Sequence, residues 1–234
     1  MDGWKKIEEG VSLTQNLSFE SSLETVNVMQ KTLGLYAHAL SLIKTTEEPK
    51  VALVRMSLVS QNLNTLSLAV DSAIMGYYIQ SMILLRNVYE NWLAFWYLAK
   101  FPGDAEIWLD PNRYPLKAET MRNKVEFVSH ETKAKLHDFR SELNRFNHTD
   151  SIAVLSRLRK DREKTFVRSG VEFHPVELDA CASSILFWSA NMLIAMNSWI
   201  PKNHEDWHIS YKSILDEIVE FQDKFYSSQN KARA

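Results

Sequence analysis

The stretch from Gly76 to Pro102 constrains the fold more than any other part of the chain, because neither glycine nor proline occurs between its two ends. A run of this length without a helix breaker, rich in Leu, Trp and Tyr, predicts one long α-helix. At about 100° per residue, the main polar side chains fall within one arc of roughly 140°, and apolar side chains fill most of the rest of the circumference. The arc consists of Gln80, Arg86, Asn87, Glu90 and Asn91.

This polar arc contains one ion pair and three amides, and it lacks the lysines that solubilise most exposed helix faces. A charge that is buried must be paired and hydrogen-bonded to be tolerated. The arc therefore predicts the wall of a polar pocket, with Arg86 and Glu90 facing inward together. An Arg followed by Glu four residues later is the less favourable order on an isolated helix, so helix stabilisation alone does not explain the pair.

The rest of the chain is equally poor in helix breakers. Six Gly and six Pro are few for 234 residues, and 45% hydrophobic with 11% aromatic residues can fill a sizeable core. We therefore expect an all-α fold, with residues 1–234 forming a single domain, a bundle of about six to eight helices. The first helix of the body is expected at Phe19–Ile43, and about 15 residues at the N-terminus and about eight at the C-terminus are expected to fray.

Two segments between the helices depart from this pattern. Residues 150–168 contain six Lys or Arg and only two acidic residues after Asp150, which fits either a phosphate-binding stripe or a solvated helix end. The solvated end is favoured because no aromatic residues for base stacking are interleaved. The segment Thr165–Phe173, TFVRSGVEF, predicts a small β-hairpin near 165–173, turning at Ser169-Gly170.

Charge and cysteine content bound the cellular setting. The formal net charge of −2 provides no global field to attract nucleic acid or an anionic membrane. The single Cys181 cannot form an internal disulfide, and the N-terminus has no secretory signal pattern. The weakly charged run Cys181–Ile200 contains Ser and Asn throughout, which suits a buried helix better than a lipid-exposed span. We expect a cytoplasmic protein that does not associate with a membrane.

The segment HEDWH, beginning at His204, matches the H-E-x-x-H pattern of zinc hydrolases, in which two His one turn apart bind metal and Glu acts as the base. Pro201 and Asn203 precede it, so the segment falls in the first turn of a helix, where ligands are held loosely. A zinc hydrolase using His204, Glu205 and His208 is therefore the weakest functional alternative. The sequence indicates no metal and no cofactor.

His148, in the segment LNRFNHTD, is a third candidate beside Arg86 and Glu90. In a structural interpretation, the three groups interlock buried helices. In a functional one, Arg86 holds a phosphate or carboxylate, Glu90 orients it, and His148 acts as acid or base near neutral pH. The candidate binding residues around them are Gln80, Asn87, Asn91 and Asn144.

The residues GYYIQSMILLRNVYE, followed by YLAKFP and a later NHTD, resemble an uncharacterised all-helical prokaryotic family known only as a domain of unknown function. Members share a helix bearing L-L-R-x-x-x-E and a downstream Asn/His segment. The family is distantly similar to the HEPN class of helical domains, many of which are ribonucleases with Arg, a polar residue, three variable residues and His. Asn91 stands at the position of that His.

Because Asn91 replaces that His, the resemblance implies a binding or interaction module rather than an enzyme. It also implies association, since HEPN-type domains commonly act in pairs. We expect a homo-oligomer, specifically a homodimer, with exposed helices rich in Trp and Tyr at the interface. RNA and protein are the candidate partners. The alternative is a metal-independent ribonuclease that uses Arg86, Glu90 and His148.

Overall fold

A computed structural model of the protein describes residues 2–125, 137–138, 141, 143, 158–161, 164–167 and 171–233. Within these ranges the regular structure is almost entirely helical and includes eight α-helices, so the predicted all-α bundle is confirmed. The elements are α1 (Asp2–Ser21), α2 (Leu23–Leu42), α3 (Pro49–Ile74), α4 (Tyr78–Lys100), the 3-10 turn η1 (Pro102–Asp104), α5 (Ala105–Leu109), α6 (Ala118–Lys124), β1 (Leu158–Asp161), β2 (Lys164–Val167), α9 (Pro175–Asn197) and α10 (Glu205–Arg233).

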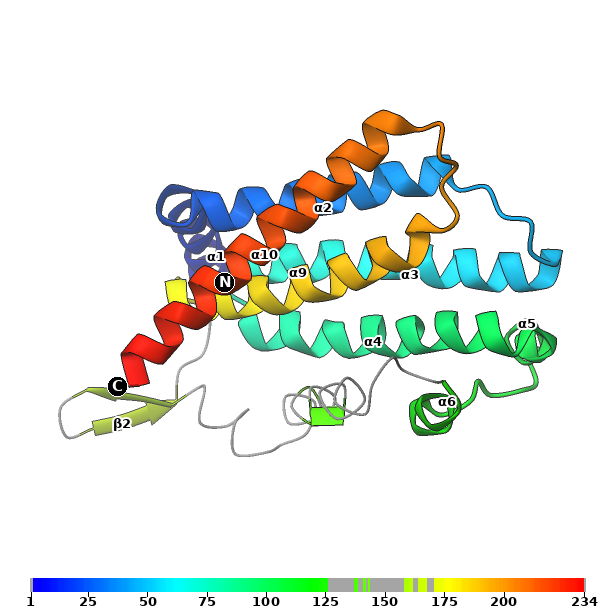
Figure 1. Ribbon diagram of the computed structural model, residues 1–234. Helices are drawn as coiled ribbons and strands as arrows, with labels where there is room; N and C mark the ends of the chain where they lie inside the picture. The colour runs from blue at the N-terminus through cyan, green and yellow to red at the C-terminus, as the bar shows by residue number, and fades with distance from the viewer. Residues whose placement is uncertain are drawn as a thin grey trace.

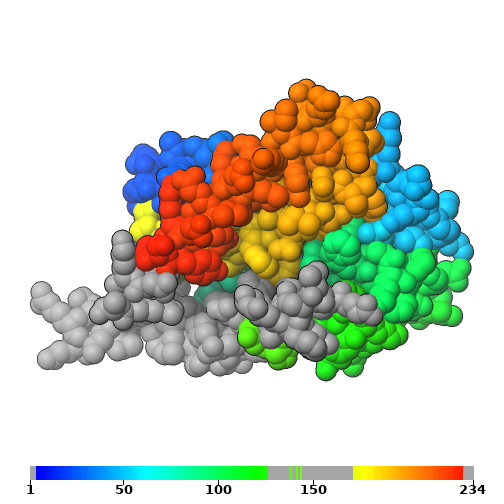
Figure 2. Space-filling model, in the orientation of Figure 1, coloured from blue at the N-terminus to red at the C-terminus, as the bar shows by residue number. Residues whose placement is uncertain are grey.

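The long helices form the body of the molecule. α3 and α4 run antiparallel and pack along their length, and α9 lies against both of them (Figure 1). α2 packs on α3 and α9, while α10 crosses diagonally over α2 and α9 on the surface of the bundle (Figure 2). α5 and α6 lie at the end of the body where α4 finishes (Figure 1). The predicted central helix therefore packs against α3 and α9, and α6 also contacts it.

The turn between α3 and α4 depends on Gly76, which has a φ of 83°. A Cβ atom at this position would lie 2.8 Å from Thr14 Cγ2 and 2.9 Å from the backbone oxygen of Glu172. Beside it, the hydroxyl of Tyr78 accepts a hydrogen bond of 2.9 Å from the backbone N–H of His174. Only glycine adopts this φ without strain and leaves room for both neighbours. The turn is thus held between α1 and the segment that leads into α9.

The first helix differs from the prediction, because the expected helix Phe19–Ile43 is divided into α1 and α2 at Ser22. Ser22 leaves the helical conformation with a φ of −135°, which lets the chain change direction. Ser18, one turn earlier, is fully buried and donates its hydroxyl to the backbone oxygen of Ile74 at 2.8 Å. This contact fixes α1 against the end of α3. The terminal segments expected to fray are helical as well, since α1 begins at Asp2 and α10 continues to Arg233.

The two-stranded hairpin lies earlier than predicted. β1 and β2 pair antiparallel, with Leu158 opposite Val167 and Asp161 opposite Lys164. The expected hairpin within 165–173 is therefore wrong for its first arm, because this arm pairs with the preceding strand β1 and not with the residues that follow it. The expected turn at Ser169-Gly170 lies outside the described residues. The second arm is not a strand, because its residues pack elsewhere: Val171 approaches Gly10 of α1, and Glu172 approaches Gly76.

The core is centred on α9 and the aromatic residues of α4. Trp188 of α9 is fully buried and meets Tyr89 and Trp92 edge-on, with ring centroids 5.4 and 5.7 Å apart. By length and composition, α9 is the one helix of the described ranges that could cross a membrane, with a mean hydropathy of 1.4. However, 61% of that apolar window is buried inside the bundle. Core helices of soluble proteins are also long, apolar and mostly buried, so this test does not separate them from membrane spans.

Most tryptophans serve this core and are not surface residues. The exposed fraction is at most 7% for four of them, Trp92, Trp188, Trp199 and Trp207. Trp4, at the beginning of α1, is the exposed exception at 68%. These four tryptophans are therefore not available to the partner surface rich in Trp and Tyr, which stays a prediction.

Cys181 offers a direct test of the packing of α9. Its thiol is buried beside α4, and burial raises its pKa to about 12. We expect it to react with a thiol reagent at mildly alkaline pH at least about a thousandfold more slowly in the folded protein than in denaturant, because the thiolate is the reactive form. Labelling of the native chain at the rate of an exposed cysteine would show that α9 is not packed as described.

Candidate functional site

The Arg86–Glu90 pair lies on the half-exposed side of α4. Arg86 Nε donates to Glu90 Oε1 at 3.1 Å, and the two side chains are 33% and 35% exposed. The predicted inward-facing position is therefore corrected: the pair reaches water and is not sealed in the core. The reason is geometric, because α3 and α9 cover the apolar side of α4 and most of the polar arc lies away from them, with only Asn91 at its edge in contact with α3.

The guanidinium of Arg86 is only partly used by this contact. The bond to Glu90 is made through Nε, and neither Nη atom has a hydrogen bond or ion pair to another described residue. Its planar fork therefore keeps two N–H donors on its outer edge, in the arrangement that matches a carboxylate or phosphate. Glu90 holds the fork in place, so less side-chain freedom would be lost when a ligand binds.

The polar arc continues inward through Asn91. Its side-chain amide donates to Asn62 Oδ1 at 2.9 Å, and the amide of the fully buried Asn62 in turn donates to the backbone oxygen of Val88 at 3.2 Å. The same amide nitrogen lies 3.3 Å from the sulfur of Met192 on α9. This buried pair of amides ties α3, α4 and α9 together beside the exposed arc, and its hydrogen bonds satisfy both side chains.

Asn62 is a residue that our sequence reasoning missed. A usable signal was present, because Asn62 is the amide within the apolar stripe Leu58, Val59 and Leu66 of α3. An amide at a core position needs a partner, which predicts a matching polar group on a neighbouring helix.

Of the remaining predicted site residues, two are described by the structure and two are not. Gln80 and Asn87 are exposed on the polar arc of α4, on the same side as Glu90. His148 and Asn144 lie outside the described residues, so their distance from Arg86 stays a prediction. The structure thus pairs Arg86 with Glu90 and Asn91 with Asn62, and it leaves Asn87 exposed on the same helix.

The HEDWH segment forms the start of α10, as expected from the sequence. His208 Nε2 lies 3.3 Å from the backbone oxygen of Pro201, so this imidazole is engaged with its own turn. His204 and Glu205 line a groove of about 410 Å³ with His38 of α2. Across the described ranges, no three His, Cys, Asp or Glu side chains are placed to hold a metal ion. The zinc-hydrolase alternative gains no geometric support.

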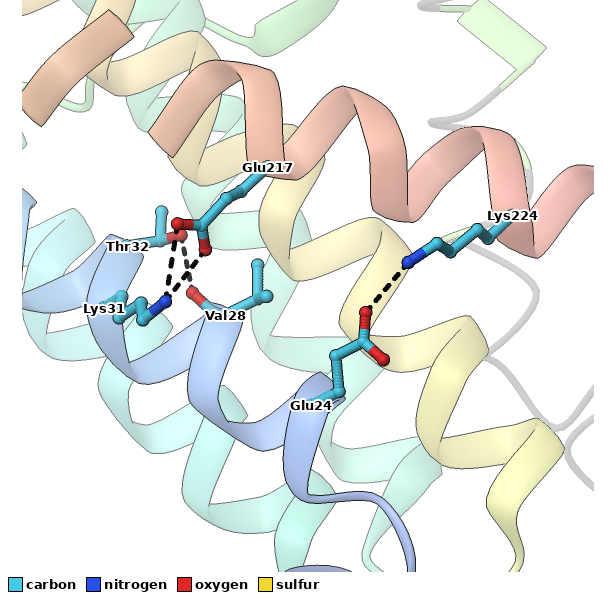
Figure 3. A network of polar contacts seen from close by, with 6 residues as sticks. All are labelled: Glu24, Val28, Lys31, Thr32, Glu217 and Lys224. Carbon is cyan, nitrogen blue, oxygen red and sulfur yellow. Dashed lines mark hydrogen bonds and ion pairs between the residues drawn. The ribbon is translucent and has the colours of Figure 1, made fainter. Parts of the chain in front are cut away.

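A second groove, of about 420 Å³, lies between α2 and α10. Figure 3 shows the two ion pairs that cross it, Lys31–Glu217 at 3.2 Å and Glu24–Lys224 at 3.0 Å. Exposed pairs of this kind contribute up to about 1 kcal/mol each. The charges on both walls are already paired with each other, so the groove is better explained as the junction between two helices than as a ligand site.

A third polar cluster, in the core, was also missed. Arg55 of α3 is only 4% exposed, and its guanidinium pairs with Glu47 and stacks on Phe95 and Trp199, 3.9 and 4.6 Å from their ring centroids. Burial lowers the pKa of Arg55 to about 10, so the side chain stays charged at neutral pH. In the sequence, Arg55 could have been recognised as the one charged residue on the apolar face of α3. The cluster fastens the loop between α2 and α3 to the body of the bundle.

Comparison with protein-family profiles, with curated proteins and with solved structures finds no match for this chain.

Proposed function

We propose that the protein is a helical binding module, of the HEPN-like type that its sequence resembles, which takes a phosphate or carboxylate group of its partner at Arg86. The observation that supports this proposal is the outer edge of the Arg86 guanidinium, which has no partner among the described residues. The Arg86 side chain is one-third exposed and is oriented by Glu90. A fixed planar fork recognises two oxygens of an anion at once, which gives direction as well as affinity.

The neighbouring side chains favour binding over catalysis. Gln80, Asn87 and Asn91 can donate and accept hydrogen bonds, but amides do not act as acid or base near neutral pH. On the polar arc of α4, the described titratable groups are Arg86 and Glu90, and these are already paired. The arc therefore provides recognition groups for an anion and its polar surroundings.

Arg86→Ala tests the proposal, with inorganic phosphate as the probe in an NMR titration of the full chain. A hydrogen bond to a charged group contributes about 1.5–3 kcal/mol. We therefore expect the substitution to weaken phosphate binding by roughly 10- to 100-fold. Arg86→Lys should recover only part of the loss, because an ammonium cannot form the planar fork.

Arg113→Ala is the matched control, since Arg113 is an exposed arginine whose Nε is also paired with a carboxylate, that of Asp110 at 3.2 Å. Its removal should leave phosphate binding unchanged. If both alanine variants lose affinity equally, or if phosphate shifts no resonance near Arg86, the chain does not use this guanidinium for binding.

A metal-independent ribonuclease is the second candidate, and the accessibility of the Arg86–Glu90 pair to a polynucleotide favours it. In this reaction Arg86 would hold the scissile phosphate, Glu90 would orient it, and His148 would supply the acid or base. The chain should then cleave RNA in the presence of EDTA, and His148→Ala should abolish cleavage. Wild-type protein that leaves both single-stranded and structured RNA intact would exclude this activity.

A further inference from the structure

Between Leu53 and Leu68 the outward face of α3 carries no charge, whereas Lys50 and Asp71 nearer its ends are exposed. The one charged residue between Leu53 and Leu68, Arg55, is buried, so the exposed side chains are all neutral. The outward side of α10 is different, with Lys212, Asp216 and Glu220 exposed as on most solvated helices. The exposed side chains of this part of α3 are Leu53, Met56, Ser57, Ser60, Gln61, Asn64 and Leu68.

The neighbouring helix α2 continues this neutral surface. Its charged residues Glu24 and Lys31 reach toward α10 (Figure 3), which leaves a second exposed stripe free of charge. α2 and α3 are joined by the hydrogen bond from Tyr36 Oη to the backbone oxygen of Val59, at 2.8 Å. We call these two uncharged stripes the neutral face; its members on α2 are Gln30, Gly34, Ala37 and Ser41.

Gly34 is the residue of the neutral face that the isolated chain does not explain. It lies in the interior of α2, where glycine costs about 0.5–1 kcal/mol relative to alanine. A Cβ atom at this position would meet no other atom within 4 Å, so nothing inside the chain requires its absence. A second helix that approaches α2 closely from outside would require it.

The neutral residues of α3 also follow a self-complementary pattern. When two copies of α3 are placed antiparallel about a twofold axis between Ser60 and Gln61, Leu53 of one copy faces Leu68 of the partner subunit at both ends. Ser57 then faces Asn64 of the partner subunit, and the small Ser60 lies where the helices cross. A twofold interface must be self-complementary in this way.

We propose that the neutral face is the surface through which the chain pairs with a second copy of itself, α3 against α3. A surface without charge gives no selectivity for nucleic acid or a charged protein, and an equally neutral surface fits it best. With ~1.5 Å rise per residue and helices ~10 Å wide, the two stripes cover ~500 Å² per copy. The total of about 1,000 Å² reaches the lower bound for a specific interface.

Three charge variants of the full chain test this pairing by light scattering after gel filtration. The wild type should have twice the mass of one chain, and Leu53→Glu should halve it. Adding Leu68→Lys to Leu53→Glu should restore the dimer, because the new carboxylate would face the new ammonium of the partner subunit. Val219→Glu, which alters an equally exposed apolar residue on α10, should leave the dimer intact. Leu53 is 58% exposed, so the fold should tolerate the change, and circular dichroism checks it.

A cysteine scan gives a second measurement that does not depend on weakening the dimer. Ser60→Cys should form a disulfide with its own copy in the partner subunit under mild oxidation, whereas Ser213→Cys on α10 should not. The buried Cys181 should not interfere. A wild type that is monomeric at its solubility limit, or equal crosslinking of both cysteines, would overturn the pairing. Arg86→Ala should leave the dimer unchanged, so the anion site and the neutral face are tested separately.

Discussion

Replacing Arg55 by alanine should lower the free energy of unfolding by about 3 kcal/mol, one of the two largest effects expected for a single substitution in this chain. The change removes a guanidinium that stacks on Phe95 and Trp199, and it leaves a cavity between the two rings. It also leaves the Glu47 carboxylate without its partner. The loss stays near the lower end for buried pairs because 26% of the Glu47 side chain remains exposed.

Urea unfolding followed by circular dichroism measures this effect. Arg113→Ala, which breaks an exposed pair, should change the free energy of unfolding by less than about 0.5 kcal/mol. The double variant Arg55→Met with Glu47→Leu should recover most of the loss, since apolar side chains of similar volume can replace a buried pair. An Arg55→Ala midpoint equal to that of the wild type would show that the guanidinium is not enclosed as described.

Gly76→Ala should destabilise the protein by about 2–4 kcal/mol. A φ of 83° costs an L-residue about 1–2 kcal/mol, and the added Cβ would press on the Thr14 methyl group and the Glu172 backbone. The backbone oxygen cannot move aside as the end of a long side chain could. The segment into α9 must therefore shift, which should also disturb the hydrogen bond between Tyr78 and His174.

Gly103→Ala is the matched control for this prediction. A Cβ at Gly103 meets nothing within 4 Å, and its φ is not in the left-handed region, so its effect should stay within about 0.5 kcal/mol. Thermal and urea unfolding of both variants give the comparison. Similar stabilities for the two would mean that the turn before α4 does not need glycine.

The long helices could be predicted because their information is local. The apolar spacing of α3, the uninterrupted run of α4 and the Pro175 start of α9 each depend on residues within one helix. The break at Ser22 was missed because it is fixed by a distant contact, the bond from Ser18 to Ile74. The prediction of the hairpin register failed for a related reason, because distant contacts again decide the structure: Val171 packs against α1 and Glu172 against Gly76.

The candidate site was predictable only in part. Helical spacing placed Arg86 and Glu90 on one side of α4, and the structure shows them paired. Whether that side faces the core or water depends on how α3 and α9 dock, which the sequence of α4 does not specify. The partner of Asn91 depends in the same way on the alignment of the antiparallel helices, which brings Asn62 within 2.9 Å across 29 positions of sequence.

The contacts between α2 and α10 have a consequence for how the chain folds during synthesis. Glu24 and Lys224 are 200 positions apart, and Lys31 and Glu217 are 186 apart. At ~5–20 residues per second, a ribosome needs roughly 10–40 s after completing α2 to deliver the helix that covers it. During that interval Val28, almost fully covered in the finished bundle, stays open to solvent or to chaperones. The bundle therefore closes late, and a nascent chain stalled before Glu205 would be a preferred target for quality control.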